Sequence, residues 1–202
     1  ILLPSFFQNV LLFLISFNIT RNTIPINSVD VSLMLNDSVG FIKVNRFSAK
    51  TFKEFERASD KLYDQGMKKL ILDLRDNPGG YLSAAVNICD KLLEKDELIV
   101  FTKGRMRGKQ EIYSRTTDKL EKIKVNVLIN DGSASASEII AGAIQDNDRG
   151  TIIGRRSFGK GLVQEEIKMG DGSAIRLTTQ RYYTPSGRSI QKDYEESNEE
   201  YF

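Results

Sequence analysis

Hydrophobic positions along the chain follow two periods in turn, and this predicts a succession of strands and helices. Residues 39–47 alternate apolar and polar side chains, as a half-buried strand does, and residues 69–74 form a short apolar run. Between them, apolar residues recur at helical spacing over 52–63, with Ser48 as the expected N-cap and Gly66 as the expected stop. Strands that alternate with helices in this way are typical of the α/β class.

The same alternation continues through most of the chain. A second amphipathic helix is expected over residues 82–93, and Cys89 on its apolar face is interpreted as a packing residue. A third helix is expected over 137–147. The remaining expected elements are strands at 97–102, 125–130, 151–154, 162–169 and 174–183, with a charged, exposed connection at 103–124.

The two ends of the chain depart from this pattern. Residues 1–17 are strongly apolar but interrupted, and their uninterrupted run is shorter than the roughly 20 residues that a membrane-spanning helix needs. No basic residue precedes Arg21, so the basic start of a signal peptide is missing. We interpret this segment as a buried strand or the remnant of a neighbouring domain, with a membrane-associated segment as the alternative. Residues 192–202 carry five acids against one lysine and predict a solvated acidic tail.

Composition excludes several classes of chemistry. The 202 residues are 40% hydrophobic and 28% charged, which is ordinary for a globular protein, and a net charge of +2 gives no electrostatic case for nucleic acid. The absence of histidine excludes Ser-His-Asp and Cys-His catalysis and imidazole metal sites. A single cysteine excludes an internal disulfide and a multi-thiolate zinc site. No metal or organic cofactor is implied, and any nucleophile needs a base other than histidine.

The first segment with candidate chemistry is Asp73-Leu-Arg-Asp-Asn-Pro-Gly-Gly80, where an expected strand runs into paired glycines and then a helix. Glycines allow a sharp turn and the close approach of another group to their N–H donors. Such donors at a helix N-terminus suit an anion or a developing oxyanion. The alternative is a simple strand-to-helix turn.

The second segment is Gly132-Ser-Ala-Ser-Ala-Ser-Glu138, which opens the third expected helix. Small neighbours leave the Ser135 hydroxyl accessible, and the N–H of Ala136 could face a substrate carbonyl. The alternative is that Ser135 and Glu138, three residues apart, form a capping box that only satisfies helix-end donors.

The third segment, Gly154-Arg-Arg-Ser-Phe-Gly-Lys-Gly161, nearly matches a phosphate-binding loop. It fails where Gly161 replaces the hydroxyl that would hold magnesium, and it leads into a strand instead of a helix. Nucleotide binding is therefore disfavoured. Lys160 can instead be a serine's base if burial keeps its amine neutral, or simply a surface lysine in a turn.

Four motifs in this order resemble the carboxy-terminal processing (tail-specific) serine peptidases. They are the Asp73–Gly80 segment, Ser133-Ala-Ser-Ala-Ser-Glu138, Gln145-Asp146 and Phe158-Gly-Lys-Gly-x-Val-Gln164. The resemblance runs from about Val39 to Gln191. It implies a core like the crotonase and caseinolytic-protease spiral of strands and helices, in agreement with the α/β pattern.

The resemblance also implies a catalytic mechanism. Ser135 would be the nucleophile, Lys160 the general base, and Gln164 the residue that orients the lysine. Since a lysine accepts a proton only when neutral, we expect Lys160 to lie in a desolvated site. The expected walls of that site are Phe158, Val163, Ala134 and Ala136.

Further positions follow from the same resemblance. Gly79 or Gly80, together with Ala136, would supply the N–H groups of an oxyanion hole. Glu138 and Asp146 match family positions and are interpreted as supporting structure, not as direct participants.

The resemblance divides the chain into an N-terminal segment (1–38), a peptidase core (39–191) and the acidic tail (192–202). Family members usually carry a PDZ domain before the core, and here only a few residues around 17–25 resemble its closing strand and linker. The expected location is the periplasm or cell envelope, and the expected partners are unfolded proteins or peptides.

The function predicted from the sequence is therefore a serine endopeptidase that acts in C-terminal processing or degradation of envelope proteins. The main alternative is a catalytically silent peptide-binding or scaffold module of the same fold. A crotonase-like acyl-CoA enzyme would also use glycine amides for an oxyanion, but it has no evident need for a Ser-Lys pair.

Overall fold

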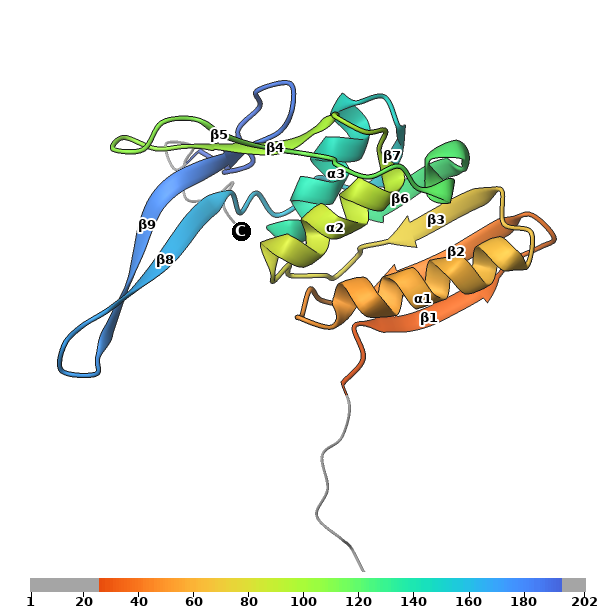
Figure 1. The fold of residues 1–202 in the computed structure, drawn as a ribbon, viewed down its shortest axis with the longest axis horizontal. Coiled ribbons are helices and arrows are strands. Elements are labelled where there is room, and N and C mark those ends of the chain that lie inside the picture. Colours follow the sequence, from red (N-terminus) through yellow and green to blue (C-terminus); the bar gives the residue numbers. More distant parts are fainter. Residues whose placement is uncertain (1–25, 194–202) are drawn as a thin grey trace, which may run out of the picture.

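Two β-sheets and three α-helices make up residues 26–193, the part of the chain that this computed structural model describes (Figure 1). The interpretations placed on residues 1–25 and 194–202 lie outside the described residues. The elements are β1 (Val29–Met34), β2 (Val39–Val44), α1 (Thr51–Asp64), β3 (Lys69–Asp73), α2 (Leu82–Leu92), β4 (Leu98–Lys103), β5 (Gln110–Tyr113), the 3₁₀ helix η1 (Lys119–Lys122), β6 (Lys124–Ile129), α3 (Ala136–Asp146), β7 (Gly150–Gly154), β8 (Leu162–Lys168) and β9 (Ala174–Tyr183).

The five-stranded sheet has the order β1-β2-β3-β6-β7, and its last four strands are parallel. Each parallel strand adds to the same side of the previous one, so right-handed crossovers place α1, α2 and α3 on one face. In Figure 1 the three helices lie along that face. The carboxyl ends of β3 and β6 adjoin, with Asp73 opposite Leu128, so the chain segments that follow both strands meet at one edge.

The core lies between this sheet and the helices. Fully buried side chains of the central strands, such as Leu72 and Val127, pack against helix residues such as Phe55, Ile88 and Ile140. Burial of one such side chain contributes about 1.5–3 kcal/mol to folding. Nine of the eleven residues of α3 are buried, so this helix is a fixed scaffold and not a surface element.

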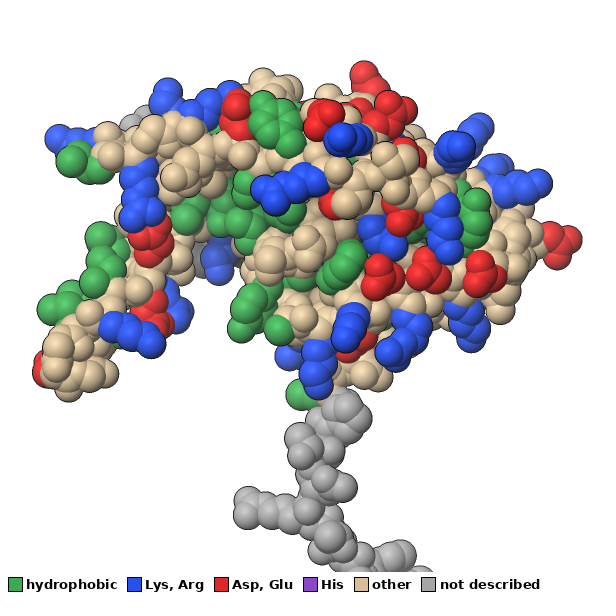
Figure 2. Space-filling model, viewed as in Figure 1, with side chains coloured by type: hydrophobic (Ala, Val, Ile, Leu, Met, Phe, Trp, Pro, Cys, Tyr) green, Lys and Arg blue, Asp and Glu red, His purple; other side chains and the backbone are tan. Residues whose placement is uncertain are grey.

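The second sheet has the order β5-β4-β9-β8 and is antiparallel. Its strands β8 and β9 extend away from the body as an arm, and Figure 2 shows a hollow between the arm and the body. Ile167 and Ile175 face each other across the two strands, and both are about half exposed. The arm therefore carries apolar side chains into solvent.

The predicted α/β fold is confirmed, and each predicted strand and helix within residues 39–183 is present, most with shifted ends. The prediction of an exposed connection at 103–124 is wrong in part, because this stretch contains β5 and η1 and buries Ser114 and Leu120. The prediction that Ser48 is the N-cap of α1 is wrong, because the helix begins at Thr51 and its N-cap is Lys50. The Ser48 hydroxyl instead contacts the hydroxyls of Ser28 and Thr51. The pattern also missed β1, which pairs antiparallel with β2. No helix among residues 26–193 is long and apolar enough to cross a membrane.

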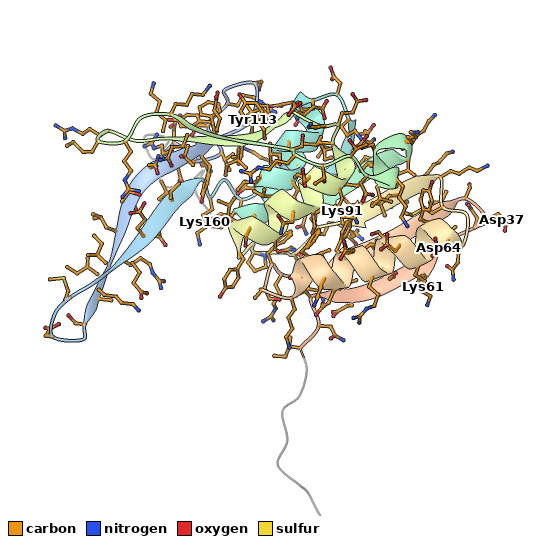
Figure 3. The ribbon with its side chains drawn as sticks, in the orientation of Figure 1. Asp37, Lys61, Asp64, Lys91, Tyr113 and Lys160 are labelled. Carbon is orange, nitrogen blue, oxygen red and sulfur yellow. The ribbon has the colours of Figure 1, made fainter. Side chains whose placement is uncertain are left out.

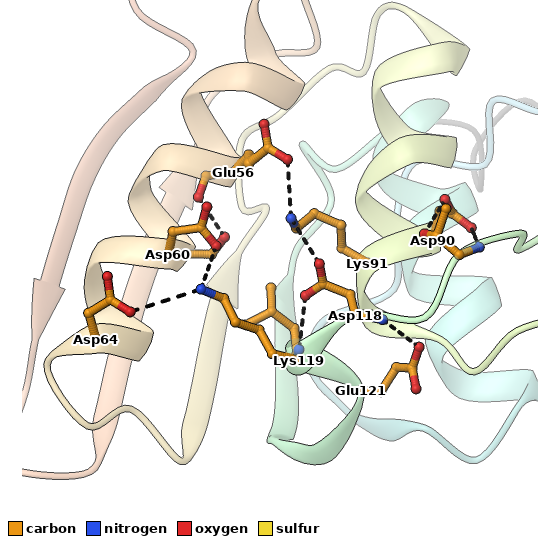
Figure 4. Close-up of polar contacts among 11 residues, drawn as sticks. Glu56, Asp60, Asp64, Asp90, Lys91, Asp118, Lys119 and Glu121 are labelled. Carbon is orange, nitrogen blue, oxygen red and sulfur yellow. Dashed lines mark hydrogen bonds and ion pairs between the residues drawn. The ribbon is translucent and has the colours of Figure 1, made fainter.

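A cluster of charged side chains ties α1, α2 and η1 together (Figure 4). The Lys91 ammonium is 3.2 Å from Glu56 Oε1 and 3.0 Å from Asp118 Oδ2. Burial alone would lower the pKa of Lys91, but its hydrogen bonds to Asp118 and Glu56 outweigh it and raise the pKa. The charged form is therefore favoured on folding, and its contribution is lost only as pH rises through this raised pKa.

Replacing Lys91 by methionine should lower the free energy of unfolding by about 1–3 kcal/mol, since it leaves two carboxylates facing each other. The loss is below that of a fully buried pair because the Glu56 side chain is 41% exposed. Urea unfolding at neutral pH would measure it. Lys95→Met, at an exposed lysine, is the control and should change the free energy by less than about 0.5 kcal/mol. Equal losses in both variants would contradict the role of the cluster.

Candidate active site

Ser135 occupies a strained backbone turn at the start of α3. It is the residue before the first helical position, and its φ of +56° and ψ of −109° lie in a region that residues with side chains rarely adopt. Such strain costs about 1–3 kcal/mol and persists where the surrounding structure enforces it, often at functional sites. A sharp turn from a strand into a helix also raises a side chain above the surrounding surface. Ser135 is half-buried, whereas its neighbours Ala134 and Ala136 are buried.

The two flanking serines have structural contacts. Ser133 is fully buried; its hydroxyl donates to Leu74 O at 2.8 Å and accepts from Asn130 N at 3.0 Å. Ser137 is also fully buried, and its hydroxyl donates to Asn77 O at 3.0 Å. Of the three alternating serines, Ser135 alone reaches the surface.

The Asp73–Gly80 segment packs directly on the start of α3. The buried Asn77 donates from Nδ2 to Val44 O at 2.7 Å, and its carbonyl accepts from Ala134 N at 2.9 Å. Gly79 has a φ of +93°, and a Cβ on it would lie 2.7 Å from Ser135 Cβ and 2.6 Å from Ala134 O. Glycine is therefore required here by both conformation and space.

Two backbone N–H groups remain available in the segments that meet at Ser135. Gly79 N donates to Asn77 Oδ1 at 2.9 Å, so this amide is already engaged. Within residues 26–193, the amides of Gly80 and Ala136 have no hydrogen-bond partner. Ala136 is the first residue of α3, where the helix dipole favours negative charge. Of the two glycines expected to supply an N–H group to an oxyanion hole, Gly80 is the one whose N–H is free.

An ion pair between buried Asp73 and exposed Arg75 braces the same turn. The Arg75 guanidinium donates to both carboxylate oxygens of Asp73, at 2.9 and 2.7 Å. Burial by itself raises the pKa of Asp73, but the bonds from Arg75 outweigh it and hold the pKa below its usual value. The carboxylate thus stays charged at neutral pH and fixes the strand end that precedes the glycines.

The Glu138 carboxylate joins the Ser135 segment to the Lys160 segment. It is buried, and its Oε2 accepts from Ser135 N and from Lys160 N, each at 2.8 Å. Its Oε1 accepts from the Ser157 hydroxyl and from Gly159 N, each at 2.7 Å. The Glu138 half of the capping box is thus present, and the same carboxylate brings two distant backbone segments together.

The side chains of Lys160 and Gln164 are exposed. The expectation that Lys160 lies in a desolvated site is wrong for this structure. Ala134 and Ala136 are buried, as walls would be, but Phe158 is 59% exposed and does not cover the amine. Figure 3 shows Lys160 at the base of the arm. Its side chain is exposed because β8 leaves the body just after this residue.

Asp146 lies at the other end of α3 from Ser135. Its Oδ2 accepts from the Ser186 amide at 3.0 Å and hydroxyl at 2.6 Å, and its Oδ1 pairs with Arg188. Burial would raise the pKa of Asp146, but these bonds and one from Thr184 hold it below its usual value. An α-helix rises 1.5 Å per residue, so Asp146 is too far from Ser135 to touch a reacting group.

Sequence patterns missed the polar groups that hold these segments in place. Asn77, Ser157 and Gln191 all make hydrogen bonds within or beside the site, and no pattern distinguished them from ordinary loop residues. Asn77 stands between two turn-forming residues, so its only signal was membership of a motif. The arrangement as a whole joins an accessible hydroxyl, unpaired amides and the backbone of a lysine in adjoining segments, which suits attack on a carbonyl group.

Comparison with known proteins identifies similar chains. Residues 38–198 match peptidase family S41. A carboxyl-terminal-processing protease of Synechocystis is 41% identical over 179 residues, which cover 87% of this chain and 42% of that protein. The carboxy-terminal processing protease CtpB of Bacillus subtilis is 39% identical, covering 88% of this chain and 37% of that protein.

Solved structures agree with the sequence matches. The photosystem II D1 C-terminal processing protease has a TM-score of 0.73 and 34% identity, covering 85% of this chain and 47% of that one. A putative S41 protease of Bacteroides fragilis has a TM-score of 0.70 at 18% identity and so shows the fold alone. The chain spans about two-fifths of the length of the curated relatives that it matches.

Proposed function

The chain belongs to peptidase family S41, and from this membership we propose that it is the catalytic part of a serine endopeptidase. The observation that carries the proposal is the strained turn at Ser135, which packs on Gly79 and lies between segments whose Gly80 and Ala136 amides are free. The names of the relatives favour an active peptidase over a catalytically silent module of the same fold. They also favour it over an acyl-CoA enzyme.

In the proposed mechanism, neutral Lys160 accepts the proton of the Ser135 hydroxyl as its oxygen attacks a peptide carbonyl. The resulting oxyanion is held by the amides of Gly80 and Ala136, and loss of one such donor typically costs about 100- to 1,000-fold in rate. Lys160 then protonates the leaving amine, and water hydrolyses the acyl-enzyme. Gln164, four residues after the lysine, would orient its amine once the arm closes toward the body.

Because Lys160 is exposed, the proposed mechanism requires a bound substrate to cover its amine. An amine acts as a base only in its neutral form, which desolvation favours. A polypeptide bound in the hollow between the arm and the body would exclude water from Lys160 (Figure 2).

The proposal extends to substrate and location in coarser terms. The relatives are bacterial and chloroplast processing proteases, so we propose unfolded proteins or peptide C-termini as substrates and an envelope or periplasmic location. Residues 39–191 would be the peptidase core, with β1 paired to its edge, and the rest of residues 1–38 an apolar segment and the remnant or linker of a PDZ-like domain. Membrane association through the apolar residues 1–17 is a further hypothesis, which rests on their composition.

The direct test is hydrolysis of β-casein by the full chain, together with labelling by a serine-directed phosphonate. We expect casein fragments, inhibition by the phosphonate, and a mass adduct on the peptide that contains Ser135. Hydrolysis of an acyl-CoA with casein left intact would overturn the proposal.

Replacing Gly79 by alanine should abolish most activity, by about 100-fold or more, because the new Cβ would displace Ser135. The control is Gly172→Ala, since Gly172 also has a positive φ, of +87°, but has open space around its Cβ position. Gly172→Ala should lose stability through backbone strain and keep its kcat. Equal kcat losses in both variants would contradict the placement of Gly79 beside the nucleophile.

A further inference from the structure

The backbone on either side of Lys160 is held by hydrogen bonds from two directions. On one side, the Glu138 carboxylate accepts from the amides of Gly159 and Lys160. On the other side, the buried Gln191 accepts at Oε1 from Gly161 N, at 3.0 Å, and donates from Nε2 to Lys192 O at 3.1 Å. The Lys160 backbone is thus fixed even though its side chain is exposed.

The chain segment that carries Gln191 runs closely alongside Gly159 and Gly161. Lys192 N donates to Gly159 O at 3.0 Å, and Tyr182 N donates to Gly161 O at 2.7 Å. A Cβ on Gly161 would lie 2.3 Å from Gln191 N, so only glycine permits this approach. Gln191 therefore lies in close contact with the segment that carries Lys160. A residue larger than glycine at position 161 would prevent this contact.

Packing holds this segment on one side only. A cavity of about 550 Å³ lies on its other side, and the walls of the cavity include Glu138, Ser157, Gly159 and Gln191. On the side of the cavity the segment lacks packed neighbours that would resist its movement. Hydrogen bonds therefore matter for its position, and among side chains Glu138 and Gln191 supply those on either side of Lys160.

Gln191 is in turn anchored to the helix that carries the nucleophile. The turn before it is bonded to Asp146 at the end of α3 through Ser186 and Arg188. The other end of α3 carries Ser135 and Glu138. The Lys160 segment is consequently connected to both ends of one rigid helix.

We propose that Gln191 is a positioning residue, whose carboxamide holds Gly161 and so fixes where Lys160 stands relative to Ser135. This inference rests on the proposed role of Lys160 as the base. Gln191 touches no reacting atom; it acts through the backbone of Gly161. A displacement of a catalytic group by about 1 Å can cost about 100-fold in rate, so a single hydrogen bond at this place has a large effect.

The test uses Gln191→Met, which keeps the side-chain length and removes both hydrogen bonds. Its matched control is Gln180→Met, because Gln180 is equally buried and its Nε2 donates to Thr102 Oγ1 at 2.9 Å, on the second sheet. Both variants lose a buried amide, so both should lose similar thermal stability. Only Gln191→Met should lower kcat, by about 10- to 100-fold, with KM within about twofold of the parent.

Amide hydrogen exchange in the full chain tests the positioning without relying on activity. In Gln191→Met the Gly161 amide should exchange about tenfold faster or more, and it should be unchanged in Gln180→Met. Gln191→Glu keeps an oxygen for this amide and should recover most of its protection and most of the rate. Parent-like exchange and kcat in Gln191→Met, or equal kcat losses in the two Met variants, would overturn the inference. An unreactive Ser135 would instead overturn the proposed function, and the exchange result would still decide the role of Gln191.

Discussion

Replacing Ser135 by alanine should lower kcat for peptide hydrolysis by about 10⁴-fold or more while leaving the protein fully folded. Removal of the nucleophile of a serine hydrolase leaves only binding and oxyanion stabilisation, so the loss is far larger than that of a supporting residue. The Ser135 hydroxyl makes no hydrogen bond to a distant backbone carbonyl, as the hydroxyls of Ser133 and Ser137 do, so stability should change by less than about 1 kcal/mol. Burst kinetics with a peptide ester and thermal unfolding would measure the two quantities.

Ser133→Ala and Ser137→Ala provide the matched controls, with the opposite pattern of effects. Each removes a fully buried hydroxyl that hydrogen-bonds to backbone, so each should lose about 1–2 kcal/mol of stability. Both should retain activity, because neither hydroxyl reaches the surface. An inactive but stable Ser133→Ala variant would show that the nucleophile is a different serine.

Ser135→Gly separates the catalytic role from the strain. Glycine adopts a φ of +56° without the penalty that a side chain brings, so this variant should be inactive and more stable by about 1 kcal/mol. A gain in stability with total loss of activity is expected where a strained conformation serves function. Denaturant unfolding of Ser135→Gly against Ser135→Ala would show it.

The elements of the fold could be predicted because they depend on hydrophobic period. The buried strand at 69–74 and the helix that buries Ile139 and Ile140 were evident from the sequence alone. The strand β1 could not be predicted in this way, because its residues are half-buried or exposed and it is held by pairing with β2. Pairing with a partner leaves no periodic signal in a strand at a sheet edge.

The candidate site could be predicted only as a set of residue types in order. The choice between Gly79 and Gly80 depends on the side chain of Asn77, which accepts from the first amide and leaves the second one free. The contact between Gln191 and Gly161 joins residues thirty positions apart, and nothing in either segment specifies it. Hydrogen bonds of this kind follow from tertiary structure, which local patterns do not contain.

Replacing Lys160 by arginine should abolish activity as completely as replacing it by alanine, although arginine keeps the positive charge. A guanidinium cannot be deprotonated in proteins, so it cannot accept the proton of Ser135. Because Lys160 is exposed in this structure, neither substitution disturbs a core contact, and both variants should keep the stability of the parent within about 0.5 kcal/mol. Labelling of Ser135 by a serine-directed phosphonate would measure acylation without requiring substrate turnover.

The same lysine determines how acylation depends on pH. Since only the neutral amine acts as a base, the rate of labelling should rise with pH. A bound polypeptide would exclude water from Lys160, so a non-hydrolysable peptide analogue placed beside the site should speed labelling at neutral pH. Lys168→Arg, at an exposed lysine of β8, is the control and should leave the labelling rate and its pH dependence unchanged. A flat profile between pH 5 and 9, or an active Lys160→Arg variant, would exclude the lysine as the base, and another group would then have to take the proton of Ser135.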